Sequence, residues 1–275
     1  MRLPLPTRWS AGAAMLAATL LAVTVSAAPA GAITHGDLDG DGHPYVGLMV
    51  AKDADGNPLW RCSGTLLSAT VYLTAGHCTE APAVSAEIWF GSDLTDAEAI
   101  DFPAHGDAHG TTYVHPDFDP ADFTRRDVGV VVLDSPVTMP EYGELPALDS
   151  IDPLAAEPGK APTFTTVGYG VQRMFPPAAA WKIESQRIRM VATPRLLQAN
   201  TKTTGDYSIL LSANADTGGA CNGDSGGPNF IGDSNVVGAV TSSAKSTLCK
   251  GSSGAFRMDR EWALSWVDTF LTPAP

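Results

Sequence analysis

Residues 223–228 read Gly-Asp-Ser-Gly-Gly-Pro, and no other stretch of this chain says as much about its fold and chemistry. Ser225 has glycines two residues before it and one and two residues after it, so the backbone there meets little steric restriction. Such a turn can expose the serine hydroxyl and direct backbone N–H groups toward an oxyanion, as acyl transfer requires. A serine alone is a weak nucleophile and needs a histidine base and a carboxylate that orients the base. The stretch therefore predicts two partners elsewhere in the chain.

Both partners occur upstream. Residues 73–78 read Leu-Thr-Ala-Gly-His-Cys and supply His77, while residues 126–133 place Asp127 at the head of an apolar run. A strand in that run would carry Asp127 inward, where an unpaired carboxylate is costly. The neighbouring acids, in a polar, Pro-containing stretch typical of an exposed loop, are Asp117, Asp119 and Asp122. The other histidines, interpreted as surface or structural groups, are His35, His43, His105, His109 and His115.

With these motifs in the order His, Asp, Ser, the chain resembles the trypsin/chymotrypsin-like serine proteases from about Ile33 to its C-terminus. The resemblance implies an all-β fold of two antiparallel β-barrels, with the active site in the cleft between them and a C-terminal α-helix. It also implies a serine endopeptidase that hydrolyses peptide bonds through an acyl-enzyme intermediate. Protein or peptide substrates, and neither a cofactor nor a metal, are then expected.

The resemblance assigns a role to each site residue. Ser225 would attack the scissile carbonyl, and His77 would act as general base and then as general acid. Asp127 would hold the imidazole in its working tautomer. The backbone N–H groups of Gly223 and Ser225 would form the oxyanion hole, in which one lost donor typically costs about 2.7–4 kcal/mol of barrier.

Residues 1–32 have the features of a signal peptide. Arg2 and Arg8 precede an uncharged stretch over residues 11–28, and Ala30-Gly31-Ala32 matches the small-x-small pattern of a cleavage site. The alternative is an uncleaved membrane anchor, since the run approaches spanning length. Its content of Ala, Thr and Ser makes it only weakly hydrophobic, so a secreted, extracellular protein is predicted.

Cleavage before Ile33 would create a start, residues 33–36, that resembles the mature N-terminus of the family. In the family the carboxylate at the position of Asp224 pairs with that free amino group and shapes the oxyanion hole. Export alone would then generate the active terminus. Cleavage after Ala30 is the alternative, and it would leave Gly31-Ala32 for a second protease.

The charge of the chain argues against some partners. The formal net charge is −13, and removal of Arg2 and Arg8 with the signal peptide would lower it to −15. The remaining sequence has no Lys/Arg cluster that suggests nucleic acid or anionic lipid. We expect a monomer that binds neither nucleic acid nor a membrane.

Four cysteines in an exported chain indicate disulfides, and four cysteines permit three pairings. The resemblance selects Cys62–Cys78, beside the histidine, and Cys221–Cys249, beside the serine. The first would close a loop of about 15 residues, worth roughly 3 kcal/mol in the loop-entropy estimate. A zinc site is the alternative, but no C-x-x-C spacing supports it.

Short apolar runs separated by Gly/Pro/Asp-rich breaks predict strands of an all-β chain. These runs are Val46–Val50, Val71–Leu73, Ile88–Phe90, Val128–Leu133 and Val236–Val240. Only residues 260–271 read as a helix, which would face the core and end before Pro273. Its apolar residues are Trp262, Trp266, Val267, Phe270 and Leu271.

The predicted domains follow the resemblance. An N-terminal barrel over residues 33–148 would carry His77 and Asp127, and a C-terminal barrel with its helix over residues 149–275 would carry Ser225. The Pro-rich region from Pro140 to Pro162 would connect them.

The substrate pocket is expected, by position relative to Cys221, to involve Gly219 at its base and Gly254 in its wall. Residues Thr241, Ser242 and Ser243 would form an edge that pairs with the substrate backbone. No carboxylate awaits a basic side chain, so the sequence disfavours cleavage after Arg or Lys and favours an uncharged, apolar residue.

Three alternatives stay open at this point. Residues 37–42 begin like a calcium loop, but Leu48 stands where a bidentate Glu is required, so a polar surface loop is favoured. A catalytically inactive homologue that serves as a binding module would lack a triad member or an oxyanion glycine, and none is missing. An esterase of the α/β-hydrolase type would need the order Ser, Asp, His.

Overall fold

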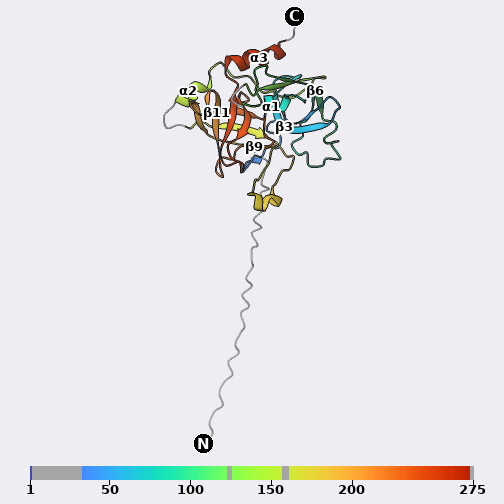
Figure 1. Ribbon diagram of the computed structural model, residues 1–275. Helices are drawn as coiled ribbons and strands as arrows, with labels where there is room; N and C mark the ends of the chain where they lie inside the picture. Colours follow the sequence, from blue (N-terminus) through green and yellow to red (C-terminus); the bar gives the residue numbers. More distant parts are fainter. Residues whose placement is uncertain (2–32, 123–125, 157–160, 273–275) are drawn as a thin grey trace.

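The computed structural model describes residues 1, 33–122, 126–156 and 161–272. The predicted signal peptide, apart from Met1, and Pro273 therefore lie outside the described residues. The described part consists mainly of antiparallel strands in two units, with a helix at the C-terminal end (Figure 1).

The first unit is a closed barrel of six strands in the order β2-β3-β4-β7-β6-β5. The neighbouring strands pair antiparallel, with Leu48 opposite Trp89 and Tyr72 opposite Val131, for example. All seven residues of β2 are buried, as its run of small and branched apolar residues predicts. The strands are β2 (Val46–Lys52), β3 (Pro58–Leu66), β4 (Val71–Thr74), β5 (Ser85–Trp89), β6 (Ala108–Val114) and β7 (Gly129–Leu133).

The second unit is an eight-stranded antiparallel sheet in the order β1-β9-β8-β12-β13-β14-β11-β10. An isolated antiparallel bridge between Thr163 and Arg195 joins the start of β8 to the start of β10, so the sheet curls back on itself. The strands are β1 (Asp37–Leu38), β8 (Phe164–Gly168), β9 (Met190–Ala192), β10 (Leu196–Thr201), β11 (Gly205–Ala213), β12 (Pro228–Ile231), β13 (Val237–Ala244) and β14 (Gly251–Arg257).

The two ends of the chain cross between the units. Strand β1 precedes the closed barrel in sequence but pairs with β9 of the second sheet. Helix α3 (Glu261–Leu271) follows the second sheet but packs on the first barrel, where the rings of Tyr113 and Phe270 lie 5.1 Å apart. The segment before the first barrel is thus held by the second sheet, and the helix after the second sheet is held by the first barrel.

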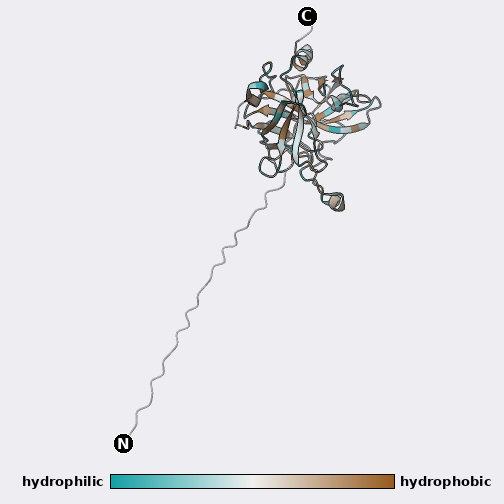
Figure 2. Cartoon of the chain, turned by 60° about the vertical axis from the view of Figure 1, so that its left-hand side comes forward, coloured by the Kyte–Doolittle hydropathy of each residue, from teal (hydrophilic) through white to brown (hydrophobic). Residues whose placement is uncertain are grey.

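The larger hydrophobic core is shared by both units. It contains Leu48 and Leu73 of the first barrel together with Val167 and Phe230 of the second sheet. Hydrophobic segments gather in the central strands, and polar segments lie at the periphery (Figure 2). Because this core is continuous, the site between the units rests on a rigid support.

The all-β class, the paired barrels and the C-terminal helix are as predicted, with the second sheet curled rather than fully closed. The helix was predicted over 260–271 and begins one residue later. Three short helices were not predicted: α1 (Gly76–Thr79) after β4, α2 (Ile151–Ala156) in the connection between the units, and η1 (Pro177–Lys182) at the tip of a projecting loop (Figure 1). All three are shorter than the window in which periodicity is visible.

The predicted polar loop at residues 37–42 is held to the second unit by a buried salt bridge. Asp39 accepts hydrogen bonds from Arg189 Nε at 2.7 Å and pairs with His43 Nδ1, and the side chains of Asp39 and Arg189 are both 1% exposed. A guanidinium held against this carboxylate repels a cation, which argues against calcium at this loop.

Candidate active site

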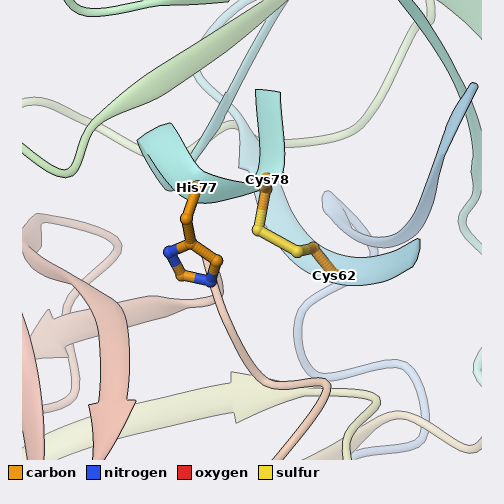
Figure 3. A group of neighbouring side chains, drawn as sticks. All are labelled: Cys62, His77 and Cys78. Atoms are coloured by element: carbon orange, nitrogen blue, oxygen red, sulfur yellow. A yellow bond between two sulfur atoms is a disulfide. The ribbon is translucent and has the colours of Figure 1, made fainter. Parts of the chain in front are cut away.

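His77 lies on the short helix α1 (Gly76–Thr79), which follows β4 directly. The neighbouring Cys78 is bonded to Cys62 of β3, so a disulfide fixes the backbone beside the imidazole (Figure 3). The indole Nε1 of Trp60 donates to the Cys78 carbonyl at 3.0 Å and holds the same turn. Although His77, Cys62 and Cys78 lie close together, both sulfurs are consumed in the disulfide and are not thiolate ligands for a metal.

Asp127 ends the segment before β7 (Gly129–Leu133) and is completely buried. Its carboxylate receives the Nδ1 of His77 at 3.1 and 3.0 Å and the backbone N–H of the same residue at 2.9 Å. The hydroxyl of Ser242 donates to Oδ2 at 2.5 Å. The burial of this carboxylate is therefore compensated by three donor groups, as burial of a charge requires.

This arrangement fixes the tautomer of His77. An ionised carboxylate only accepts hydrogen bonds, so Nδ1 must carry the proton that lies between the imidazole and Asp127. The other ring nitrogen, Nε2, then carries no proton and is the basic nitrogen of the ring. The side chain of His77 is 17% exposed, so the ring borders solvent and a substrate could approach it.

Ser225 lies in a tight turn between Cys221 and β12 (Pro228–Ile231). Gly223 and Gly226 have φ values of +93° and +77°, in the region that favours glycine. A Cβ on Gly226 would lie 2.0 Å from the Thr74 hydroxyl, so a side chain has no room there. The carbonyl of Ser225 accepts the N–H of Ser63 at 2.8 Å, which ties the turn to the first barrel.

The backbone N–H groups of Gly223 and Ser225 have no hydrogen-bond acceptor among the residues that the structure describes. Their neighbours in the turn are paired, since Asp224 N–H donates to the Cys221 carbonyl and Gly226 N–H donates to the Thr241 carbonyl. Because backbone donors in folded proteins are nearly always paired, two unpaired donors beside a serine hydroxyl are well placed to receive an external oxygen.

Asp224 is completely buried and points away from solvent into the second unit. Its oxygens accept the N–H groups of Gly170 at 2.8 Å and Cys221 at 2.9 Å. Burial raises the pKa of Asp224 to about 7, although the two hydrogen bonds and the charge of Arg61 act in the opposite direction. Within the described ranges, no side-chain cation forms a salt bridge with this carboxylate.

Ile33 is also completely buried and packs with Met190 and Ala192. The next residue, Thr34, pairs with Gly219 through two backbone hydrogen bonds of 3.0 and 3.1 Å. The segment that would start the mature chain is therefore docked next to the strands that precede the nucleophile turn. In this chain Ile33 is still bonded to Ala32 and has no free amino group.

A cavity of about 340 Å³ opens beside these groups and is lined by His77 and Ser225. Three of the predicted pocket residues, Thr241, Ser242 and Ser243, also line it. The other two do not. Gly219 is covered by its pairing with Thr34, and Gly254 lines a separate small cavity that shares Ser242 and Ser243 with the first.

Both predicted disulfides are present, Cys62–Cys78 and Cys221–Cys249. Sequence reasoning missed the part of the Ser242 hydroxyl, which donates to Asp127. It also missed the part of Ser63, whose Oγ donates to the Gly223 carbonyl at 3.0 Å. Neither serine lies in a motif, so only the fold brings them to the site.

No helix among the described residues is both long enough and apolar enough to cross a membrane. Comparison with known families matches residues 40–258 to the family model described as Trypsin. A chymotrypsin from Phaedon cochleariae is 25% identical over 239 residues, which cover 82% of this chain and 77% of that protein.

Solved structures also resemble this chain in fold. A structure named HL collagenase has a TM-score of 0.63 at 19% identity and covers 86% of this chain and 97% of its own. Human heparin binding protein has a TM-score of 0.63 at 18% identity, with 88% of this chain and 100% of its own covered.

Proposed function

The chain belongs to the trypsin family and is a serine endopeptidase of the trypsin/chymotrypsin type, and from that premise we propose that it is a secreted enzyme in which Ser225, His77 and Asp127 form the catalytic triad. The observation that carries the assignment is the buried Asp127 carboxylate held against His77 Nδ1, with His77 and Ser225 on one cavity.

In the proposed first step, His77 Nε2 takes the proton of the Ser225 hydroxyl while Oγ attacks the carbonyl carbon of the scissile bond. Asp127 stabilises the imidazolium that forms and does not take its proton. His77 then donates the proton to the leaving amine, and an acyl-enzyme on Ser225 remains. A water activated by the same imidazole hydrolyses the ester and restores the serine.

The negative charge that develops on the carbonyl oxygen is proposed to lie against the N–H groups of Gly223 and Ser225. The unpaired state of both donors supports this role. Donors fixed before the reaction stabilise the developing charge without reorganisation, which is why such sites contribute strongly to the rate.

Activation is proposed to depend on the amino group of Ile33. Its release by cleavage after Ala32 would supply a cation for Asp224, whose raised pKa marks a carboxylate without a sufficient counterion. The docked position of Ile33 and Thr34 supports this proposal, because Thr34 pairs with Gly219, which lies five residues before Asp224 in the chain.

The substrate is proposed to add as a strand along the Thr241–Ser243 segment, with the residue before the cut in the 340 Å³ cavity. Among the described residues that line this cavity, none is acidic. We therefore expect cleavage after uncharged, apolar residues rather than after Arg or Lys, with protein or peptide substrates and a monomeric enzyme.

A binding function without catalysis is the second candidate, and one structural neighbour is named for binding heparin. Heparin is a polyanion, and this chain has a net charge of −13, so long-range electrostatics oppose that partner. The complete set of candidate catalytic groups also favours hydrolysis.

The test is the Ser225→Ala variant of the chain that starts at Ile33. It should lose at least about 1000-fold in peptide hydrolysis and lose labelling by a fluorophosphonate probe. Ser234→Ala, in an exposed turn outside the site, is the matched control and should keep both properties. Stoichiometric labelling of Ser225→Ala at one site would show that another residue is the nucleophile.

A further inference from the structure

The loop between β13 and β14 is positively charged in an otherwise acidic chain. From residue 234 to residue 258 the sequence contains no Asp or Glu, although the whole chain has 30 of them. The same segment carries Lys245 and Lys250, both exposed. The net charge of −13 repels anionic groups from most of the surface, whereas the positive charge of this loop attracts them. The loop is therefore a selective place for an anionic group to bind.

Lys245 lies across the backbone of Gly254. A Cβ built on Gly254 would lie 2.9 Å from Cε and 3.1 Å from Nζ of Lys245, and 2.9 Å from the hydroxyl oxygen of Ser243. The ammonium group and this hydroxyl therefore face the same spot on the strand. The absence of a side chain on Gly254 is what leaves room for them.

This spot belongs to a small cavity of about 80 Å³ that borders the candidate active-site cavity. Lys245 and Gly254 line the small cavity, and Ser242 and Ser243 line both. A peptide that adds along Thr241–Ser243 would therefore pass both cavities, and its alternate side chains would point to opposite faces.

Lys245 is not neutralised by the protein. Among the residues that the structure describes, no carboxylate forms a salt bridge with it, and no acidic residue lines either cavity. The buried cations Arg189 and Arg257 differ, since Asp39 and Asp259 pair with them. An unpaired ammonium beside a hydroxyl donor matches a carboxylate, which accepts hydrogen bonds from both.

We propose that Lys245 and Ser243 bind an acidic side chain of the substrate on the amino-terminal side of the cleaved bond. The inference rests on the proposed endopeptidase function and names its substrate class: peptides with an uncharged residue at the cut and an Asp or Glu nearby. The neutral active-site cavity selects the uncharged residue at the cut, and the small cavity selects the Asp or Glu.

The experiment uses quenched fluorescent peptides in which Glu replaces Gln at each of the four positions before the cut. The expected result is that Glu raises kcat/KM about fivefold at one position, as fits a partly exposed ion pair. Lys245→Met should reduce this Glu/Gln ratio to about one, and Lys245→Glu should invert it. Lys250→Met is the matched control, because Lys250 is in the same loop but lines neither cavity.

Two further measurements separate charge recognition from a general change in the loop. Gly254→Ala keeps the lysine but displaces it, so this variant should also lower the ratio. Salt at about 1 M should weaken the preference in the unaltered chain, because it screens exposed charges. A ratio near one at all four positions, or an equal preference in the unaltered chain and Lys245→Met, would overturn the proposal.

Failure of the proposed function gives a different result. If Ser225 is not labelled and no peptide is cleaved, the endopeptidase mechanism is wrong. The Lys245 proposal is then decided by fluorescence anisotropy with the same peptides and the Ser225→Ala protein. Tighter binding of the Glu peptide that disappears in Ser225→Ala/Lys245→Met would support it, and equal binding would overturn it.

Discussion

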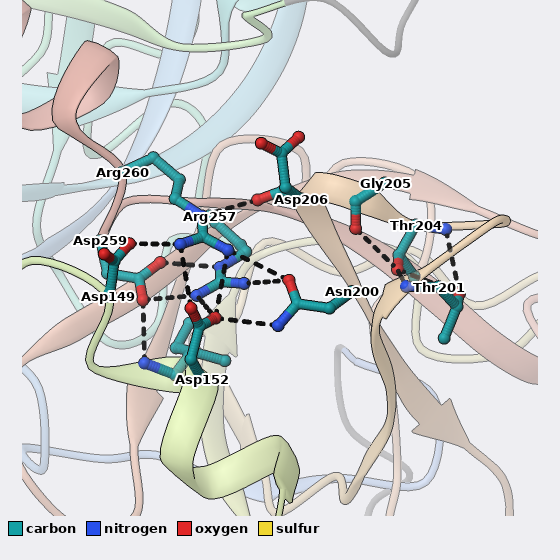
Figure 4. A network of polar contacts seen from close by, with 11 residues as sticks. Asp149, Asp152, Asn200, Thr201, Thr204, Gly205, Asp206, Arg257, Asp259 and Arg260 are labelled. Atoms are coloured by element: carbon teal, nitrogen blue, oxygen red, sulfur yellow. Dashed lines mark hydrogen bonds and ion pairs between the residues drawn. The ribbon is translucent and has the colours of Figure 1, made fainter.

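Asp259 and Asp224 are both completely buried in the second half of the chain, but their surroundings differ. Asp259 accepts Arg257 Nε at 2.8 Å and Nη2 at 2.7 Å, and the Ile151 N–H at 2.8 Å (Figure 4). The Asp224 side chain accepts two backbone N–H groups from the described residues, and burial raises its pKa to about 7. Asp259 has a counterion two residues before it in the chain, whereas Asp224 forms no salt bridge among the residues that the structure describes.

Asp259 belongs to an ion pair that stabilises the fold, whereas Asp224 is a buried carboxylate that can still receive a cation. Arg257 is itself completely buried and also contacts Asp152 and Asn200, so its network joins β14, α2 and β10 (Figure 4). Such a network is complete as soon as the chain folds. The environment of Asp224 is complete only when a cation arrives, and in our proposal processing at Ile33 supplies it.

The largest expected effect comes from the same change at both acids. Asp259→Asn removes the fully buried counterion of Arg257, leaves the partly exposed Asp152 to pair with it, and should lower the free energy of unfolding by about 3 kcal/mol. Asp224→Asn, made in a chain with an extra Met before Ile33 and measured near pH 4, should change it by less than about 1 kcal/mol, because an amide suits an environment in which the folded chain holds the neutral acid at that pH. Urea unfolding of both, in the Ser225→Ala background, measures the contrast. Equal losses would mean that the two acids are not different in kind.

The next effect concerns activity. A chain with a retained Met before Ile33 has no amino group at the right place and should lose at least about 100-fold in kcat/KM, comparable to the loss of one oxyanion donor. Its triad should remain intact, and the chain that starts at Ile33 is the control. In that control, activity should also fall at alkaline pH as the amino group loses its proton. Full activity of the Met-extended protein, with its N-terminus verified by mass spectrometry, would refute the activation proposal.

The smallest effect, counted per pH unit, is a pH dependence of stability. Because the pKa of Asp224 is raised from 3.8 to about 7 on folding, the folded Met-extended chain binds one more proton than the unfolded chain between these values. Its stability should therefore decrease as the pH rises from about 4 to about 7, by at most about 1.4 kcal/mol per pH unit from this group.

Asp224→Asn removes this contribution. The difference in the free energy of unfolding between the Met-extended chains with and without Asp224→Asn, taken at each pH, isolates the contribution of Asp224 from that of other titrating groups. In the chain that starts at Ile33 the amino group should lower the pKa of Asp224 and remove the decrease. Urea unfolding at pH 5 and pH 7 measures both. A difference independent of pH would contradict a raised pKa.

Much of the fold and of the candidate site could be predicted from local sequence. Apolar runs located the strands β2, β4, β7 and β13, and helical spacing located α3. The burial of Asp127 followed from its place before an apolar run. These features depend on periodicity and motif, which a sequence displays directly.

The features that could not be predicted depend on long-range contacts. The pairing of β1 with β9 joins residues about 150 positions apart, and two residues are too short to show alternation. Arg189 binds Asp39 across a similar separation, and Ser242 reaches Asp127 across 115 positions. Polar pairs of this kind have no local sequence pattern, because only the folded backbone brings the two residues together.

The hydrogen bond between Thr34 and Gly219 spans 185 positions of the chain, which has a consequence for the order of events during synthesis. The segment around Ile33 leaves the ribosome well before the residues of its docking site, such as Gly219. The closed barrel, built from residues 46–133, can form in the meantime. Long-range contacts of this length are slow to close. The segment at Ile33 is therefore accessible to a processing enzyme until its docking site has been synthesised, and folding then buries Ile33.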